Sequence, residues 1–256
     1  TTNSTSKPYT EEIINQALKF HSEGNIAKAA KYYQYSIDQG CKDHRVLSNY
    51  GVILKNDGNF QEAEKYYRKA IELNPQYPEA FSNLGNVLKN LGQLEEAESC
   101  FRKAIKLNPD FAEAHYNLSK TLKDLGKLKE AELEKEKSID INFLKNIDSK
   151  YREDCIKNLT HSKSQFNQDL FTLSELNFKR NGFFVEFGSY DGLIGSNTYL
   201  LEKFYNWDGI LAEPSISCHK KLKENRSANI ETKCVWKSSG EEILFNEPFS
   251  YKQMAT

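Results

Sequence analysis

The sequence lacks a strong charge and a long apolar run. Lys and Arg number 35 against 36 Asp and Glu, and a net charge of −1 gives no general attraction for nucleic acid or an anionic membrane surface. No apolar run approaches the roughly 20 residues of a membrane-spanning helix. The polar start TTNSTSKPYT also lacks the apolar core of a signal peptide. These absences predict a soluble, cytoplasmic protein that binds neither nucleic acid nor membranes.

Paired cysteines and metal-binding motifs are lacking too. The five cysteines are Cys41, Cys100, Cys155, Cys218 and Cys234. An odd number without a Cys-x-x-Cys pair disfavours both a disulfide framework and a zinc site, and it predicts reduced thiols. His115, His161 and His219 have no partner at metal-ligand spacing, so we expect ordinary surface or core histidines and no metal.

A sequence repeat fills the first half of the chain. Its period is 34 residues, the interval from Pro75 to Pro109. One copy comprises Tyr50, Gly51, Ala63, Tyr67, Ala70 and Pro75, and the next comprises Leu84, Gly85, Ala97, Phe101, Ala104 and Pro109. Fainter copies on either side give about four units over residues 10–143. The repeats resemble tetratricopeptide repeats, and the period predicts an α solenoid of antiparallel helix pairs.

Residue size within the repeat indicates packing. The small residues mark close helix approaches, and the aromatic residues fill the space between successive hairpins. Glycines in the same register of every unit predict left-handed turns after each first helix: Gly24, Gly58, Gly92 and Gly126. The fourth unit loses the pattern at Lys135 and Ser138, so we expect a polar capping helix over residues 127–138 to end the solenoid.

Two rows of polar residues also follow the repeat. Every first helix carries one asparagine at the same position: Asn15, Asn49, Asn83 and Asn117. A second row consists of Lys55, Lys89 and Lys123, with His21 at that position in the first unit. The repeats resemble those of O-linked N-acetylglucosamine transferases, in which an asparagine ladder lines a peptide-binding groove. The rows predict a protein or peptide partner with acidic residues, although duplication alone would also copy unused surface residues.

The second half has the pattern of an open α/β sheet. Short apolar strands end in glycine or acid, and ligands of such sheets bind at the carboxyl ends of parallel strands. The predicted elements are a strand at Phe183–Phe187, a turn from Gly188 to Gly192, a helix capped by Ser196 or Asn197 and running through Phe204, and a strand at residues 209–212 that ends at Glu213.

Each of these residues has a chemical use at a ligand site. Gly188 and Gly192 allow positive φ and a close approach of the backbone. The helix near Ser196 offers unpaired N–H groups, while Glu213 can accept hydrogen bonds from two ribose hydroxyls. Glu186 can orient the loop or meet a cationic group. The loop does not read Gly-x-Gly-x-x-Gly, so a dinucleotide site is only weakly indicated.

The motifs FFVEFGSYDG, SNTYLLEK, W-x-G-I-L-x-EP and KLKENR, in this order, resemble FkbM-type S-adenosylmethionine-dependent methyltransferases over residues 165–245. The resemblance implies a Rossmann-like fold, S-adenosylmethionine as cofactor and methyl transfer to a hydroxyl of a sugar or another small molecule. The resemblance does not identify which residues would be catalytic. The residues it assigns to the cofactor are Glu186, Gly188, Asp191, Gly192, Ser196, Asn197 and Glu213.

The sequence departs from that family after Glu213. A helix over residues 215–225 and strands near residues 230–235 and 243–245 are predicted, but no Asp-x-Glu-Gly motif occurs. We therefore expect a piece of a larger protein or a reduced relative. The predicted organisation is repeats at 10–143, a linker at 144–163 with a short helix near 152–159, and a partial methyltransferase domain at 164–256. The competing interpretation is a non-catalytic scaffold that binds proteins through its repeats.

Overall fold

The structure is a computed structural model that describes residues 7–232, with side chains described from residue 11. Contacts divide the chain into two compact units, Thr1–Ile141 and Asn142–Thr256. The division falls inside one helix, α8 (Leu128–Asn146). Within the described residues, no helix is both long and apolar enough to cross a membrane.

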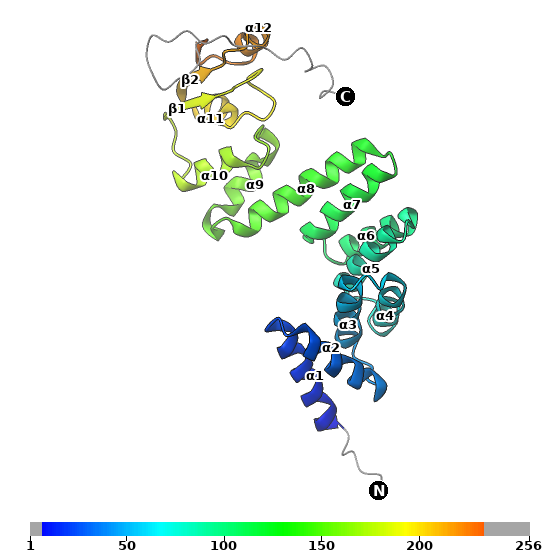
Figure 1. Cartoon of the computed structure of the whole chain (residues 1–256). Helices are drawn as coiled ribbons and strands as arrows, with labels where there is room; N and C mark the ends of the chain where they lie inside the picture. The colour runs from blue at the N-terminus through cyan, green and yellow to red at the C-terminus, as the bar shows by residue number, and fades with distance from the viewer. Residues whose placement is uncertain (1–6, 233–256) are drawn as a thin grey trace. The chain divides into compact units, whose positions relative to one another are not determined.

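The first unit consists of successive helical hairpins (Figure 1). Its helices are α1 (Lys7–Ser22), α2 (Ile26–Asp38), α3 (His44–Asn56), α4 (Phe60–Leu73), α5 (Pro78–Asn90), α6 (Leu94–Leu107), α7 (Ala112–Asp124) and the first part of α8. Short turns separate the two helices of a pair, and each second helix packs on the first helix of the next pair, as α4 does on α5 and α6 on α7. The predicted solenoid of helix pairs is therefore confirmed.

Glycine ends the first helix of each pair as predicted. Gly24, Gly58, Gly92 and Gly126 have φ values of 75, 79, 78 and 76°. L-residues rarely adopt this left-handed conformation, whereas glycine adopts it without a steric penalty. The amide of each glycine donates to a carbonyl three residues earlier, for example from Gly92 to Lys89 O at 3.0 Å. The turn thereby satisfies carbonyls that the helix end leaves unpaired.

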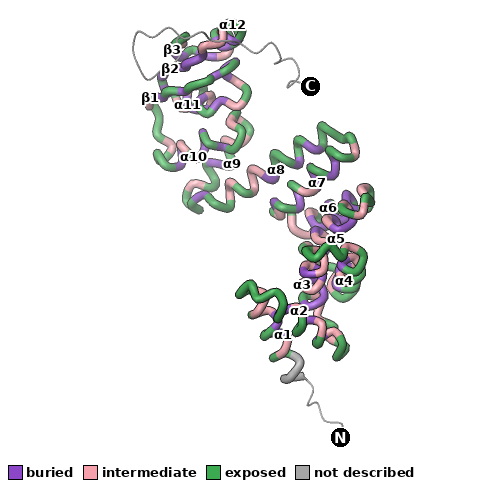
Figure 2. Tube along the Cα trace, viewed as in Figure 1, coloured by how far each residue is buried: buried purple, intermediate pink, exposed green. Residues whose placement is uncertain are grey.

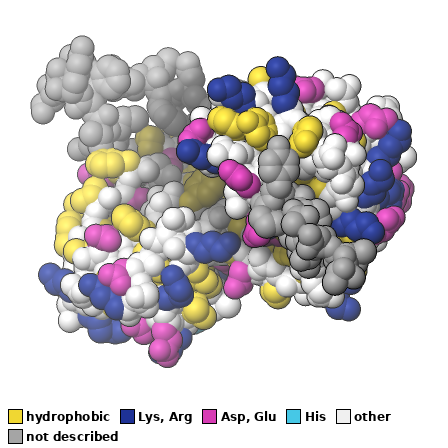
Figure 3. All heavy atoms as spheres, turned by 90° about the horizontal axis from the view of Figure 1, so that it is seen from below, with side chains coloured by type: hydrophobic (Ala, Val, Ile, Leu, Met, Phe, Trp, Pro, Cys, Tyr) yellow, Lys and Arg dark blue, Asp and Glu magenta, His cyan; other side chains and the backbone are white. Residues whose placement is uncertain are grey.

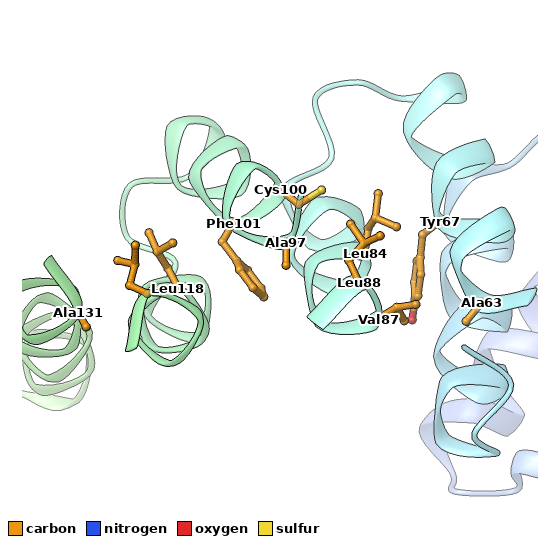
Figure 4. Packing of buried hydrophobic residues seen from close by; sticks show 11 residues of the cluster. Ala63, Tyr67, Leu84, Val87, Leu88, Ala97, Cys100, Phe101, Leu118 and Ala131 are labelled. Atoms are coloured by element: carbon orange, nitrogen blue, oxygen red, sulfur yellow. The ribbon is translucent and has the colours of Figure 1, made fainter. Parts of the chain in front are cut away.

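Within a pair, the two helices meet where a glycine faces an aromatic ring. A Cβ atom on Gly51 would lie 3.0 Å from the Tyr67 ring, and one on Gly85 would lie 2.9 Å from the Phe101 ring. Both rings are fully buried. Figure 4 shows Tyr67 between its own helix and the helix that carries Val87. The ring thus joins two successive hairpins, and Figure 2 shows buried residues along the helices with exposed outer turns.

Ion pairs repeat between neighbouring second helices. The Arg68 guanidinium lies 2.6 Å from a Glu96 carboxylate oxygen, and one period later Arg102 lies 2.8 Å from Glu130. Each arginine also pairs with the glutamate four residues earlier on its own helix. These pairs are partly exposed, so each contributes little on its own, at most about 1 kcal/mol. Figure 3 shows positive and negative side chains interspersed over the face in view.

The fourth unit contains a buried polar pair between its two helices. His115 of α7 is buried, with Nδ1 2.5 Å from Glu134 Oε2 of α8 and Nε2 2.9 Å from the Pro109 carbonyl. Burial alone raises the pKa of Glu134, but hydrogen bonds from Lys137 and His115 outweigh it and hold this pKa below its ordinary value. The helix predicted over residues 127–138 is the first part of α8, which continues to Asn146.

The second unit contains a small parallel sheet with helices. Its elements after α8 are η1 (Ser149–Tyr151), α9 (Arg152–Asn158), η2 (Leu159–His161), α10 (Gln168–Glu175), β1 (Phe183–Phe187), α11 (Tyr199–Tyr205), β2 (Asp208–Ala212), α12 (Ile216–Asn225) and β3 (Asn229–Glu231). The strand order is β1-β2-β3, all parallel, with Phe187 opposite Ala212. The described residues show a three-stranded parallel sheet, and the predicted Rossmann-like domain stays a prediction. The strand predicted near residues 243–245 lies outside the described residues.

The core of the second unit lies between the strands and helices. Leucines from α10, α11, β2 and α12 pack around Phe184 and Trp207. The Trp207 indole Nε1–H also donates to the Lys179 carbonyl at 2.9 Å, which satisfies its one polar atom. Gly209 lets β2 pass the Phe184 ring, because a Cβ there would lie 2.5 Å from that ring. This packing fixes β1 beside β2 and so sets the position of their carboxyl ends.

The Tyr67 hydroxyl generates a stability prediction. It is buried without a hydrogen-bond partner among the described residues, and burial raises its pKa. Phe101 fills the same position one repeat later without a hydroxyl. We expect Tyr67→Phe to raise the free energy of unfolding by about 1 kcal/mol, since an unpaired buried hydroxyl costs about 1–3 kcal/mol. Urea unfolding followed by circular dichroism measures this change.

Phe101→Tyr is the matched reverse variant. It adds a hydroxyl at the equivalent place, and we expect it to lower stability by a similar amount. A loss of stability in Tyr67→Phe would contradict the prediction, because it would mean that the hydroxyl makes a favourable interaction.

Candidate functional sites

The first candidate site is the first-helix surface, which carries the two polar rows of the repeat. It is defined by Asn15, Asn49, Asn83, Asn117, Lys55, Lys89 and Lys123, all on α1, α3, α5 and α7. The first helices α3, α5 and α7 contact one another in turn. The rows are therefore continuous from the second unit to the fourth.

The four asparagines differ in their surroundings. Burial raises the pKa of Tyr33, and the neighbouring Asn49 side chain partly offsets this effect; the Tyr33 hydroxyl also lies 3.1 Å from His21 Nδ1. Asn83 and Asn117 are half-buried, and their amides have no side-chain partner within the described part of the chain. Asn15 is exposed and lines an open pocket of about 430 Å³ on α1. Two amides of the ladder are thus available to a ligand on neighbouring repeats.

The lysine row is not uniform either. Lys89 Nζ lies 3.0 Å from Asp124 Oδ2, which comes from the first helix of the next repeat. Lys55 and Lys123 form no ion pair with any residue of the described range. Lys55 is half-buried and Lys123 is exposed. The surface therefore offers two unpaired ammonium groups, with a neutralised one between them.

The second candidate site is the strand-tip loop, residues 188–198, at the carboxyl ends of β1 and β2. The Gly188 amide donates to the Ala212 carbonyl at 2.8 Å, so the loop begins beside the end of β2. Gly188, Tyr190 and Gly192 all have positive φ, at 69, 47 and 75°. The parallel pairing of β1 and β2 therefore brings Gly188 and Glu213 to neighbouring strand ends.

Glu213 is buried and bonded to backbone amides. Its two carboxylate oxygens accept from the Tyr190 amide at 2.7 Å and the Ser215 amide at 2.9 Å. The carboxylate thereby ties the strand-tip loop to the turn before α12. Each oxygen has a second lone pair, so hydrogen bonds to a ribose remain chemically feasible. The predicted role of Glu213 in holding a cofactor stays a prediction.

Glu186 organises the far end of the same loop. Its oxygens accept hydrogen bonds from the Ser196 hydroxyl at 3.0 Å, the Asn197 amide at 2.8 Å and the Thr198 hydroxyl at 2.5 Å. The prediction that Ser196 or Asn197 caps the following helix is wrong. The helix α11 begins at Tyr199 with Thr198 as its N-cap residue, and Ser196 and Asn197 lie in the loop before it, where both bond to Glu186.

Asp191 closes the turn in the middle of the loop. Its Oδ1 accepts from the Leu193 and Ile194 amides at 3.0 and 2.9 Å, an arrangement in which an aspartate caps its own turn. The Asn225 side chain donates to the Asp191 carbonyl at 2.8 Å and joins the turn to α12. All three acidic residues predicted at this site therefore hold backbone or hydroxyl groups of the loop itself.

Arg226, which follows α12 and bonds to this loop, is a residue for which the sequence predicts no role. Its side chain is completely buried. The guanidinium donates to Glu202 at 2.8 Å, to the Ser196 and Thr198 hydroxyls at 2.9 Å each and to the Gly192 carbonyl at 3.1 Å. The only sequence signal was its place in the KLKENR motif, where an arginine after a polar helix indicates a solvated charge.

The charges around Arg226 compensate one another. Glu186 Oε2 lies 3.6 Å from its guanidinium, and both Glu186 and Glu202 are buried. Burial raises the pKa of Glu202, but the Ser227 amide and the Arg226 charge outweigh it, and this pKa lies below its ordinary value. One arginine thus serves two buried carboxylates, and its loss would leave both without their cation.

Ser189 is the exception in this well-bonded loop. It is 3% exposed, and its hydroxyl has no hydrogen-bond partner among residues 11–232. Buried hydroxyls without a partner are rare in proteins, and each calls for an explanation. A ligand at the strand tips is one such explanation.

Comparisons with known proteins identify the repeats. Models of the tetratricopeptide repeat match residues 78–111 and 100–133, and a model described as TPR repeat matches residues 51–92. Residues 51–133 therefore consist of tetratricopeptide repeats, and the prediction is confirmed for this part of the chain. These matches lie within the first unit, so the resemblance of residues 165–245 to FkbM-type methyltransferases stays a prediction.

Solved structures are similar to part of the chain. "Crystal structure of MamA" is 20% identical, with a TM-score of 0.49, and the match covers 53% of this chain and 80% of that chain. "First TPR of Spaghetti (RPAP3) bound to HSP90 peptide SRMEEVD" is 24% identical, with a TM-score of 0.43, covering 46% of this chain and 93% of that chain. No curated protein matches the chain.

The Arg226 network generates a second stability prediction. Arg226→Met keeps the volume but leaves Glu186 and Glu202 buried without their cation, so we expect a loss of about 3–5 kcal/mol from the second unit. Denaturant unfolding followed by tryptophan fluorescence measures it, because Trp207 lies in the core of this unit. Lys223→Met, an exposed charge on α12, is the control and should change stability little. Equal stability of the two variants would contradict the prediction.

Proposed function

We propose that the protein is an interaction scaffold whose first-helix surface binds an extended segment of a partner protein. The observation that carries the proposal is the pair of half-buried, unpaired amides of Asn83 and Asn117 at the same position of neighbouring repeats. An amide offers a donor and an acceptor, which matches the N–H and C=O groups of a peptide backbone. Binding through the backbone leaves the choice of partner to other groups on the surface.

The lysine side chains determine which partner segments bind. Lys55 and Lys123 have no ion pair among the described residues, and an acidic side chain of the partner can neutralise each. Because these ammonium groups are partly exposed, we expect their contribution to fall as salt is added. The proposed partner is therefore an extended, acidic protein segment.

The alternative is that the asparagines are copied surface residues without use. Asn49 has a polar neighbour within the repeats, since its side chain influences the pKa of Tyr33. Asn83 and Asn117 have no side-chain partner among the described residues. Replacing them therefore distinguishes a peptide-binding surface from surface residues that were only copied with the repeat.

The test replaces both of these amides. We expect Asn83→Ala/Asn117→Ala to weaken binding of a fluorescein-labelled peptide of alternating Glu and Ser roughly tenfold, since each hydrogen bond contributes about 0.5–1.5 kcal/mol. Fluorescence anisotropy measures the affinity, and circular dichroism checks that helicity is unchanged. Asn142→Ala removes an exposed amide outside the surface and serves as the control. Equal affinity of the double variant and the wild type would reject the amide ladder.

A second candidate function is favoured by Ser189. We propose that the strand-tip loop binds S-adenosylmethionine, with the Ser189 hydroxyl donating to or accepting from it. Support comes from the residues already at the strand ends, Gly188 and Glu213, and from the missing partner of this buried hydroxyl. The proposal concerns cofactor binding alone, because nothing within residues 7–232 indicates a sugar or other methyl acceptor.

Ser189→Ala tests this candidate without disturbing the loop, because its hydroxyl holds nothing in place. Isothermal titration with S-adenosylhomocysteine is expected to show binding by the wild type and a loss of about two- to tenfold in the variant, the equivalent of one hydrogen bond. Ser217→Ala, an exposed serine of α12, is the control. If the wild type gives no heat of binding, the cofactor site should be abandoned.

A further inference from the structure

One contact on the first-helix surface sets the middle repeat apart. The Lys89 ammonium lies 3.0 Å from the Asp124 carboxylate, and the two side chains are 26% and 47% exposed. Asp124 is the last residue of α7, so the carboxylate reaches across from the next repeat. It occupies the position on Lys89 that an acidic side chain of a bound segment would take.

The repeat register shows that this contact is particular to Asp124. The positions equivalent to Asp124 in the earlier units are Ser22, Asn56 and Asn90. None of them carries a charge. In particular, Asn90 stands to Lys55 as Asp124 stands to Lys89, one period earlier. The sequence thus contains its own neutral counterpart of the contact, and Lys55 has no ion pair in the described chain.

We propose that Asp124 is a specificity-determining residue of the first-helix surface. It acts as an internal carboxylate that neutralises Lys89, so acidic side chains of a partner bind only at Lys55 and Lys123. The proposal rests on the peptide-binding function above and deepens it. The preferred partner segment has two acidic residues separated by a neutral stretch, because an acid over Lys89 would meet the like charge of Asp124.

The partial exposure of Lys89 and Asp124 limits how much Asp124 can change the affinity for an acidic segment. A partly exposed lysine–carboxylate pair contributes no more than about 1 kcal/mol and is screened by salt. Asp124 therefore reduces the affinity for a uniformly acidic segment only severalfold. Discrimination of this size selects among partners and leaves binding of the correct one intact.

Two reciprocal variants test the proposal. Asp124→Asn gives the fourth unit the amide of its predecessors, and Asn90→Asp places a carboxylate beside Lys55. The first readout is the rate at which each lysine reacts with limiting acetic anhydride, measured by mass spectrometry. We expect Lys89 to react more slowly than Lys123 in the wild type and faster in Asp124→Asn. In Asn90→Asp, Lys55 should become slower.

The second readout is anisotropy with labelled peptides of alternating Glu and Ser or of alternating Gln and Ser. We expect Asp124→Asn to bind the acidic peptide about threefold more tightly at low salt, and Asn90→Asp to bind it about threefold more weakly. The neutral peptide should bind all three proteins equally. At high salt the differences should vanish.

The outcomes separate this proposal from the function on which it rests. If neither peptide binds the wild type, the binding function fails and the specificity role fails with it. If the acidic peptide binds the wild type and Asp124→Asn equally well, binding stands and the role of Asp124 is overturned. Equal acetylation of Lys89 in these two proteins would likewise overturn it, because the ion pair would then not protect the lysine.

Discussion

A contact between a glycine and an aromatic ring determines how the helices pack in the second and third hairpins of the first unit. Gly51 against Tyr67 and Gly85 against Phe101 allow no Cβ atom between the helices. This contact fixes which side of each first helix faces inward. Asn49 and Asn83 each precede the glycine by two residues, a rotation of about 200° on a helix. The packing contact therefore places the asparagines away from the hairpin interior, and the proposed binding surface follows from the core.

Features that repeat could be predicted from the sequence, because their physical causes repeat. The left-handed glycines and the buried alanines recur in all four units, and a buried aromatic residue recurs in the first three. The helix pairs that they predict are confirmed. The buried pair of His115 and Glu134 could not be predicted in this way, since it occurs in one unit only. The loss of the aromatic residue at Lys135 was visible in the sequence, whereas its neighbour Glu134 gave no sign of the bond to His115.

In the second unit the sequence predicted the strand ends but not the use of their acids. Strand periodicity and glycine turns placed Gly188 beside the end of β2. Whether a carboxylate at a strand end faces a ligand or a backbone amide depends on the path of the loop. Short sequence motifs do not reveal that path. Glu186 and Glu213 both bond to this protein's own loop and turn residues. The partner of this arrangement, Arg226, comes from a distant helix end and gave no local signal.

The two units also differ in how far along the chain their contacts reach. Each hairpin packs on its nearest neighbours, so the repeats can form one after another as the chain leaves the ribosome. The strand-tip loop cannot, because Glu186 and Glu202 receive their cation only when Arg226 has been synthesised. Until then two carboxylates would have to be buried without it, and they stay hydrated instead. During synthesis the loop must therefore form later than the strand from which it starts.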